Sequence, residues 1–204
     1  MEKSYNYKKV DAGCNKWGKE RLDLAIYIRD NILTKISNEW FIENGTLLGA
    51  WRNGKFIAHD DDFDIAMLIN TESEITNILK KIELLLLSSK YKARLVKTYA
   101  SKIEIYDESF GKFILPVEKY NGSDFHYVTL DIQFYLKKND IYECLYFVEP
   151  HKRLLNEEIL KPSSKIILEN EEFNAPNNIE KFLINNYGNL NINAKYNQNT
   201  GLYE

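Results

Sequence analysis

The stretch HDDDFDIAM constrains this chain more than any other, because four aspartates within five positions lead directly into an apolar run. A β-strand sends alternate side chains to opposite faces. A strand that starts at Asp62 therefore places Asp62 and Asp64 on one face and the intervening apolar side chains on the other. The apolar face is suited to packing in a core. The acidic face presents two neighbouring carboxylates, with Asp60 extending the row.

Like charges held this close need a counter-ion or a shared proton. Two carboxylates about 4 Å apart repel each other by roughly 4 kcal/mol at an effective dielectric constant of about 20. At neutral pH a hard divalent cation resolves this repulsion. Mg²⁺ prefers carboxylate oxygens and bridges to substrate phosphates, and Mn²⁺ is the alternative ion. The competing interpretations are a solvated acidic loop and a structural calcium site, although the run lacks the spacing of an EF-hand.

A second stretch, YVTLDIQFYL, repeats the alternation over residues 127–136. Its apolar side chains share one face, and Asp131 lies in mid-strand on the other. If this strand neighbours the first, Asp131 joins Asp62 and Asp64 as a third carboxylate ligand. Such a ligand set holds one or two metal ions. Two ions about 4 Å apart activate an attacking oxygen and stabilise a leaving oxygen on phosphorus.

A glycine-bearing segment, ENGTLLGAWRNGK, lies just upstream of the aspartates. Glycine lets the backbone approach a phosphate closely, and backbone N–H groups bind phosphate oxygens. We therefore predict a phosphate-binding segment, although glycines also mark ordinary turns and basic residues also fit an exposed surface. The predicted contacts are Gly45, Gly49 and the Thr46 hydroxyl for phosphate oxygens, with Arg52 and Lys55 neutralising the rest of a diphosphate. His59 stays open between a base, a ligand, a hydrogen-bond donor and a structural histidine.

Apolar periodicity predicts helices mixed with strands in irregular order, which indicates an α+β fold with one central sheet. We predict a single domain over 1–204. It has an N-terminal helix over about 18–37, a catalytic core over about 38–188 and a loosely held, asparagine-rich tail over about 189–204. The expected strands are 40–42, 63–69, 91–99, 102–106, 112–115, 127–136 and 142–148; 165–176 is expected to be extended, and helices are expected over 72–88 and 177–188.

Composition narrows the class of partner. The net charge is only -3 and no long basic stripe is present, so a nucleic-acid partner is not favoured. No window approaches the ~20 apolar residues that a membrane span needs, and the N-terminus lacks the apolar core of a signal peptide. The two cysteines lie far apart without metal-type spacing, which fits a reducing compartment. We therefore expect a cytoplasmic protein with no integral membrane segment.

Three motifs together resemble a known family. GTLLGAWRNGKFIAHDDDFDIAM is similar to the signature of the LicD family of phosphotransferases, which includes bacterial phosphocholine transferases and relatives of fukutin-related protein. TLDIQFY resembles the later strand of that family, and FNAPNNIEKFLINNYG resembles its closing pattern. The resemblance runs from Trp40 to Gly188. It implies a nucleotidyltransferase fold like that of DNA polymerase β, with a mixed central sheet flanked by helices.

The resemblance carries site residues onto this chain. It implies that Asp62 and Asp64 are the metal-binding pair, that Asp60 is a further acidic position and that Asp131 is the third carboxylate. Ala58 and His59 depart from the proline and tryptophan of the family, which affects the wall of the pocket, and Gln133 and Tyr135 depart from the pattern after the third aspartate. Gly45, Thr46, Gly49 and Arg52 match the phosphate-side segment, and Pro176, Tyr187 and Gly188 match the closing motif.

The implied reaction transfers a substituted phosphate from a CDP-linked donor to a hydroxyl of a cell-surface glycan or glycolipid, with release of CMP. The donors that fit are CDP-choline, CDP-ribitol and CDP-glycerol. Two alternatives stay open. One is transfer of a nucleotidyl group from an NTP to a small molecule or protein, and the other is a non-catalytic module that binds a nucleotide or cation.

Overall fold

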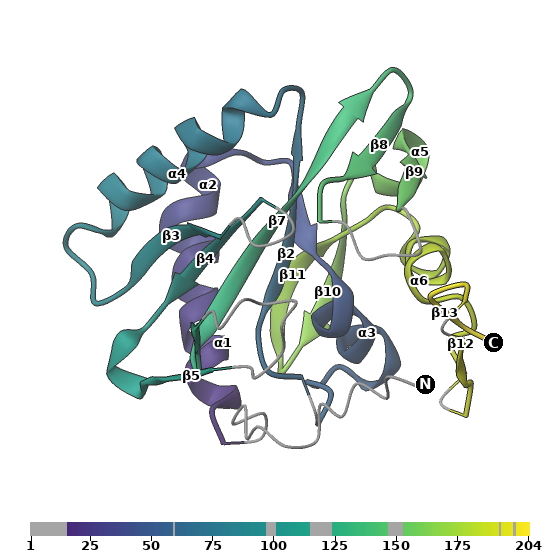
Figure 1. Cartoon of the computed structure of the whole chain (residues 1–204), viewed down its shortest axis with the longest axis horizontal. Helices are drawn as coiled ribbons and strands as arrows, with labels where there is room; N and C mark the ends of the chain where they lie inside the picture. The colour runs from purple at the N-terminus through teal and green to yellow at the C-terminus, as the bar shows by residue number, and fades with distance from the viewer. Residues whose placement is uncertain are drawn as a thin grey trace.

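A mixed β-sheet lies at the centre of the molecule (Figure 1). The computed structural model describes residues 16–58, 60–96, 101–114, 124–146, 153–191, 193–197 and 199–204. Within these residues the sheet has seven strands, in the order β1-β2-β7-β4-β3, with β8 paired to β7 and β9 paired to β8. The strands are β1 (Trp40–Ile42), β2 (Asp64–Ile69), β3 (Lys92–Val96), β4 (Lys102–Tyr106), β7 (Thr129–Lys138), β8 (Ile141–Cys144) and β9 (Leu154–Asn156).

The two strands with the clearest alternation pair with each other. β2 and β7 run parallel, with Asp64 opposite Asp131, whereas their other partners in the sheet are antiparallel. All six residues of β2 are buried. Its acidic face is therefore covered as well as its apolar face. This pairing places two predicted site residues on adjacent strands.

The helix expected over 18–37 is present in three consecutive parts: α1 (Gly18–Ile28), a π-helical segment (Arg29–Leu33) and α2 (Thr34–Ile36). It lies behind β3, β4 and β7 in Figure 1, and it packs on the sheet through fully buried side chains such as Leu24, Ile28 and Ile32. The π-helical segment is an irregularity that a 3.6-residue apolar pattern does not reveal.

The expected helix over 72–88 is α4 (Ser73–Leu86), and it lies beside α2 and β3 (Figure 1). Its buried residues Ile75, Ile78 and Ile82 follow helical spacing.

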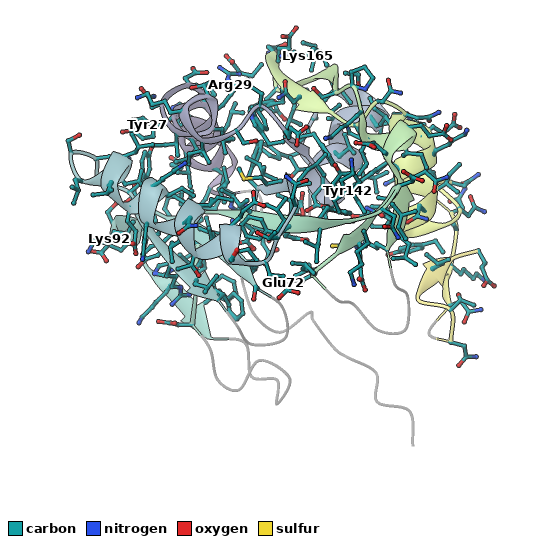
Figure 2. The ribbon with its side chains drawn as sticks, turned by 90° about the horizontal axis from the view of Figure 1, so that it is seen from above. Tyr27, Arg29, Glu72, Lys92, Tyr142 and Lys165 are labelled. Atoms are coloured by element: carbon teal, nitrogen blue, oxygen red, sulfur yellow. The ribbon has the colours of Figure 1, made fainter. Side chains whose placement is uncertain are left out.

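The extended segment expected over 165–176 is a hairpin, β10 (Ser164–Leu168) with β11 (Glu171–Ala175). Figure 2 shows Lys165 of this hairpin on the same side of the sheet as Tyr27 and Arg29. Arg29 Nη1 donates to Glu171 Oε2 at 3.0 Å. The hairpin and the N-terminal helix therefore share one face of the sheet.

Two segments contain elements that the sequence analysis did not assign. The glycine-bearing segment is a helix, α3 (Asn44–Asn53), that ends at Gly54 with a φ of 71°. The sequence analysis assigned this segment neither a helix nor a strand; in the structure Thr46, Leu47 and Leu48 are buried and hold the turns of a helix against the core. The asparagine-rich tail contains a short hairpin. After α6 (Ile179–Tyr187), β12 (Tyr196–Asn197) pairs with β13 (Leu202–Tyr203), and Gly188 forms a bridge with Tyr203.

Short elements complete the described part of the chain. Residues 97–99, 115 and 147–148 of the expected strands lie outside it. Besides α3 and the C-terminal hairpin, the described elements absent from the sequence expectations are β9, a 3₁₀ turn (Glu108–Phe110), β6 (Asp124–His126), which pairs with β5 (Lys112–Ile114), and α5 (Glu157–Leu160). They are too short to show a periodic pattern.

Candidate metal centre

Asp62, Asp64 and Asp131, here called the aspartate trio, converge at the ends of β2 and β7. Each offers a carboxylate oxygen, and these oxygens all lie within 4.8 Å of one another. Asp64 and Asp131 are opposite each other in the parallel ladder. Asp62 precedes β2, and the backbone of the next residue, Phe63, holds it beside β7. The Phe63 carbonyl accepts a hydrogen bond from the Asp131 N–H at 2.8 Å, and the Phe63 N–H donates to the Thr129 carbonyl at 3.3 Å. The backbone thus fixes the trio.

The trio is electrostatically strained in the absence of a cation. Burial, followed by the charges of neighbouring carboxylates, raises the pKa of Asp62 and of Asp64 well above the ordinary aspartate value. Burial also raises the pKa of Asp131, although the Lys102 ammonium opposes this shift. Among the described residues, the buried Asp131 Oδ1 has no hydrogen-bond partner. The carboxylate oxygens of the trio converge, and one of them has no hydrogen-bond partner among the described residues. Such hard oxygen ligands fit the preference of Mg²⁺ or Mn²⁺.

Other side chains orient the carboxylates. Gln133 Nε2 donates to Asp64 Oδ1 at 2.9 Å, and Lys102 Nζ donates to Asp131 Oδ2. Sequence reasoning missed the role of Lys102 and recorded Gln133 only as a departure from the family pattern. Gln133 shares the face of Asp131 by alternation, so that signal was available. The position of Lys102 beside the trio depends on the register of β4 against β7, and this register cannot be read from the sequence.

Thr46 has a structural contact in α3. Its side chain is fully buried, and its Oγ1 accepts from the backbone N–H of Asp64 at 3.0 Å. The hydroxyl proposed from sequence for phosphate oxygens therefore anchors the first residue of β2.

Gly45 lies against Asp60. A Cβ added at Gly45 would come within 2.5 Å of Asp60 Oδ1, so only glycine lets this carboxylate take its place. Burial and the charge of Asp61 raise the pKa of Asp60 to about 7. Asp60 groups with Asp61 and Asp62 and is not a member of the trio.

The other residues predicted to contact phosphate have different surroundings. A Cβ at Gly49 would lie 2.4 Å from the Lys55 carbonyl oxygen, so Gly49 allows α3 to pack closely on the chain that follows it. Arg52 Nη2 donates to the Leu190 carbonyl at 3.2 Å. Lys55 Nζ contacts Glu169 Oε2 at 3.2 Å and is largely exposed. Of these three residues, Arg52 lines the cavity beside the trio. His59 lies outside the described residues.

A cavity of about 540 Å³ opens beside the trio. Asp60 and Asp64 form one wall, Arg52 belongs to α3, and Tyr187 and Tyr203 come from α6 and the C-terminal hairpin. A larger cavity, about 620 Å³, lies beside Arg29 and Lys165 and contains no member of the trio. The carboxylates, rather than size, make the first cavity the candidate substrate site.

A buried polar network supports the first turn of α3 from behind. Tyr135 donates its hydroxyl hydrogen to Glu43 Oε2 at 2.8 Å, and Arg153 Nη1 donates to Asn44 Oδ1 at 2.6 Å. Burial raises the pKa of Glu43 to about 7, against the opposing effects of Arg153 and Tyr135. Tyr135, like Gln133, departs from the family pattern and has a defined contact here.

Comparison with known proteins decides the family. The family model described as "LicD/FKTN/FKRP, nucleotidyltransferase domain" matches residues 37–178, well over half of the chain. The chain belongs to the LicD family. The resemblance predicted from the three motifs is thereby confirmed. The matched region contains the whole aspartate trio, whereas Tyr187 and Tyr203 lie beyond it.

A curated protein is similar to part of this chain. The uncharacterized protein RP689 of Rickettsia prowazekii is 40% identical over 68 residues, which cover 32% of this chain and 26% of that protein. The matched part therefore spans about a quarter of the relative. In the described part of the chain, no helix combines the length and apolar character needed to cross a membrane.

Proposed function

We propose that this LicD chain is a metal-dependent phosphotransferase with the nucleotidyltransferase-like fold of DNA polymerase β. It transfers a substituted phosphate from a CDP-activated alcohol to a hydroxyl of a cell-surface glycan or glycolipid, in the cytoplasm, and releases CMP. The observation that carries the proposal is the aspartate trio on two adjacent parallel strands, beside a cavity lined by Arg52. The family match supports the reaction class.

The roles follow from position. Asp62, Asp64 and Asp131 would hold Mg²⁺ or Mn²⁺, which supplies charge neutralisation at the diphosphate. Arg52 lines the cavity and has the fork geometry that suits phosphate oxygens. Gly45 acts through the carboxylate of Asp60, which it allows into the cavity wall. Positioning and electrostatics supply most of the rate in phosphoryl transfer, so the chain needs no covalent nucleophile.

The bonds balance in one displacement. The acceptor oxygen forms a bond to the phosphorus that carries the alcohol, and the bond from that phosphorus to the oxygen of CMP breaks. CMP leaves with the electron pair, and the acceptor proton passes to a carboxylate of the site. We assign this proton to Asp60, because Asp60 lines the cavity beside Asp64 and is not a member of the trio, whereas Asp131 has one oxygen engaged by Lys102.

The direct test is CMP release from CDP-choline, CDP-ribitol and CDP-glycerol with Mg²⁺ and a glycan acceptor. The Asp62→Asn, Asp64→Asn double variant is expected to lose at least about a hundredfold of the activity, since loss of preorganised charge costs several kcal/mol. Asp140→Asn, which removes an exposed carboxylate in the turn after β7, is the matched control and should keep the parent rate. Equal CMP release by the double variant and the parent would refute the assignment.

A second reaction class has one observation in its favour, the description of the matched domain as a nucleotidyltransferase domain. In that reaction a nucleotidyl group moves from an NTP to a small molecule or protein. Product analysis separates the two, because free CMP identifies the phosphotransferase and a nucleotide attached to the acceptor identifies the nucleotidyltransferase. Metal-dependent melting without turnover of any donor would instead identify a non-catalytic nucleotide- or cation-binding module.

A further inference from the structure

An amide side chain with only one of its two ends bonded lines the cavity beside the aspartate trio. Asn44 is the first residue of α3, and it is 9% exposed. Its Oδ1 accepts a hydrogen bond from Arg153 Nη1 at 2.6 Å. Its Nδ2 has no hydrogen-bond partner in the described part of the chain, although polar groups this buried are nearly always bonded. Asn44 therefore has an N–H donor left for a ligand.

Arg153 determines which end of the amide faces the cavity. A guanidinium only donates hydrogen bonds, so the amide oxygen points to Arg153 and the NH₂ group points away from it. Asn44 lines the cavity, whereas Arg153 does not. The backbone of Arg153 is itself held, because its carbonyl accepts from the Cys144 N–H of β8 at 3.0 Å. This contact therefore turns the NH₂ group of Asn44 toward the cavity.

The position of Asn44 in the cavity suits a phosphate. Asn44 lines the same cavity as Asp60 and Asp64, so a diphosphate that bridges to a cation at the trio would bring its oxygens near the amide. The N-terminus of a helix also favours an anion. The Thr46 side chain is fully buried and does not line this cavity, so Asn44 is the polar side chain of this turn that reaches a ligand.

We infer that the NH₂ group of Asn44 donates a hydrogen bond to a phosphate oxygen of the nucleoside diphosphate, and that Arg153 is the positioning residue for this group. The inference rests on the proposed function, which places a diphosphate at the trio, and it adds a binding residue outside the trio. The competing explanation is the backbone. Asn44 has a φ of 47°, and asparagine is one of the few residues that adopt this left-handed conformation readily.

The test measures binding of pyrophosphate and of CDP to the full chain in the presence of Mg²⁺, by isothermal titration calorimetry. Asn44→Gly keeps the left-handed backbone and removes the amide. Asn44→Asp keeps the shape and replaces the NH₂ group by an oxygen. Both variants should bind both ligands roughly tenfold to hundredfold more weakly, the usual effect of losing a hydrogen bond to a charged group. The affinity of Asn44→Gly for Mn²⁺ alone should equal that of the parent.

Asn139 offers a matched control. It also has a positive φ, of 58°, but it lies exposed in the turn after β7 and does not line the cavity. Asn139→Gly and Asn139→Asp should therefore bind pyrophosphate and CDP as tightly as the parent. Losses equal to those of the Asn44 variants would show a general effect of these substitutions and would overturn the inference.

A double-mutant cycle tests the positioning role of Arg153. Arg153→Met removes the donor that holds the amide oxygen, so it should weaken CDP binding in the parent. In the Asn44→Gly background the same substitution should change CDP binding by less than about twofold, because the contact through which it acts is already gone. Equal effects in the two backgrounds would overturn the positioning role. If Arg153→Met does not fold, the Asn44 variants decide the inference.

The outcomes separate this inference from the proposed function. Parental affinity for pyrophosphate in both Asn44 variants would overturn the inference and leave the metal-dependent reaction intact. Weaker binding of cytidine with unchanged binding of pyrophosphate would also overturn it, because the amide would then contact the base. A parent that binds neither pyrophosphate nor CDP with Mg²⁺ would overturn both. The expected losses of affinity in a chain that turns over no donor would support the inference and refute the proposed reaction.

Discussion

At the scale of single residues, the site depends on Gly45 having no side chain. Gly45 lies in the first turn of α3, and the carboxylate of Asp60 fills the space where a Cβ would be. Asp60 is itself held by its neighbours, since its N–H donates to the Ile57 carbonyl at 3.0 Å and its carbonyl accepts from Arg21 Nη1 at 3.3 Å. These bonds hold the Asp60 backbone, so its half-buried carboxylate can yield to a Cβ at Gly45 only by turning away from its place in the cavity wall.

Replacement of Gly45 by alanine tests this contact. The Gly45→Ala methyl group meets Asp60 Oδ1 at 2.5 Å and must displace it. We expect a loss of about 1–3 kcal/mol in the free energy of unfolding, the usual cost of overpacking. We also expect roughly tenfold to hundredfold slower CMP release, because a displaced catalytic group lowers the rate steeply.

Gly18→Ala is the matched control in urea denaturation and in the turnover assay. Its Cβ meets only Phe56 Cδ2 at 4.0 Å, an ordinary contact, and it lies in the first turn of α1. Its turnover should match that of the parent, and its stability should equal or slightly exceed that of the parent, because alanine has the higher helix propensity. Equal behaviour of the two alanine variants would show that Asp60 tolerates displacement and that Gly45 has no special role.

At the scale of elements, regular alternation made β2 and β7 predictable. Strands whose side chains alternate over six or more residues carry a clear signal. The helical form of α3 could not be predicted in this way, because Gly45 and Gly49 are unfavourable within a helix. Their close contacts, which explain them, are known only from the structure. The C-terminal hairpin, rich in asparagine, has hardly any apolar periodicity. It is held by a bridge between Gly188 and Tyr203 that only the tertiary structure reveals.

The bridge at Gly188 gives a prediction about this hairpin. Gly188 has a φ of 77°, and a Cβ there would lie 2.5 Å from the Tyr203 carbonyl oxygen. Gly188→Ala should therefore detach the hairpin, and the Asn189 N–H, which donates to that carbonyl at 2.7 Å, should lose protection in hydrogen exchange. Because Tyr203 lines the cavity, KM for the donor should rise as well.

Gly54→Ala isolates the effect of the backbone angle. Gly54 has a similar φ of 71°, but its Cβ would be 3.7 Å from the nearest heavy atom, the Ile167 carbonyl oxygen. This variant should lose about 1–2 kcal/mol from the left-handed conformation alone, with unchanged protection at Asn189. Retained protection in Gly188→Ala would show that the hairpin does not depend on the close approach.

At the scale of the whole molecule, part of the site follows from the sequence of each strand, and part depends on how the strands are arranged in the sheet. The identity of Asp62, Asp64 and Asp131 follows from alternation within each strand. Their convergence requires that β2 and β7 be parallel neighbours, a pairing across more than sixty positions of sequence that no local pattern encodes. Lys102 and Gln133 become part of the site only through that pairing and the register of β4. The candidate metal ligands therefore follow from the sequence, and the groups that orient them follow from the topology.

The same assembly links metal binding, pH and the stability of the whole fold. Burial raises the pKa of each member of the trio, and it raises the pKa of Asp60 to about 7. A carboxyl whose pKa is higher in the folded state than in the unfolded state stabilises the fold below its unfolded pKa, about 4. That stabilisation is lost as pH rises through the folded pKa. Without metal, these groups should therefore lower the stability of the chain between about pH 4 and about pH 7.

A divalent cation should reverse this trend, because it binds the ionised carboxylates and protons compete with it at low pH. At a free Mg²⁺ concentration about 100 times Kd, the cation should stabilise the fold by about 2.7 kcal/mol, a rise in Tm of roughly 5–10 °C for a chain of this size. The rise relative to EDTA should be larger near pH 8 than near pH 6, as measured by calorimetry. The Asp62→Asn, Asp64→Asn double variant should show no Mg²⁺-dependent rise at either pH. A rise of equal size at both values in the parent would mean that Mg²⁺ binds elsewhere, since only ligands that titrate in this window make the stabilisation depend on pH.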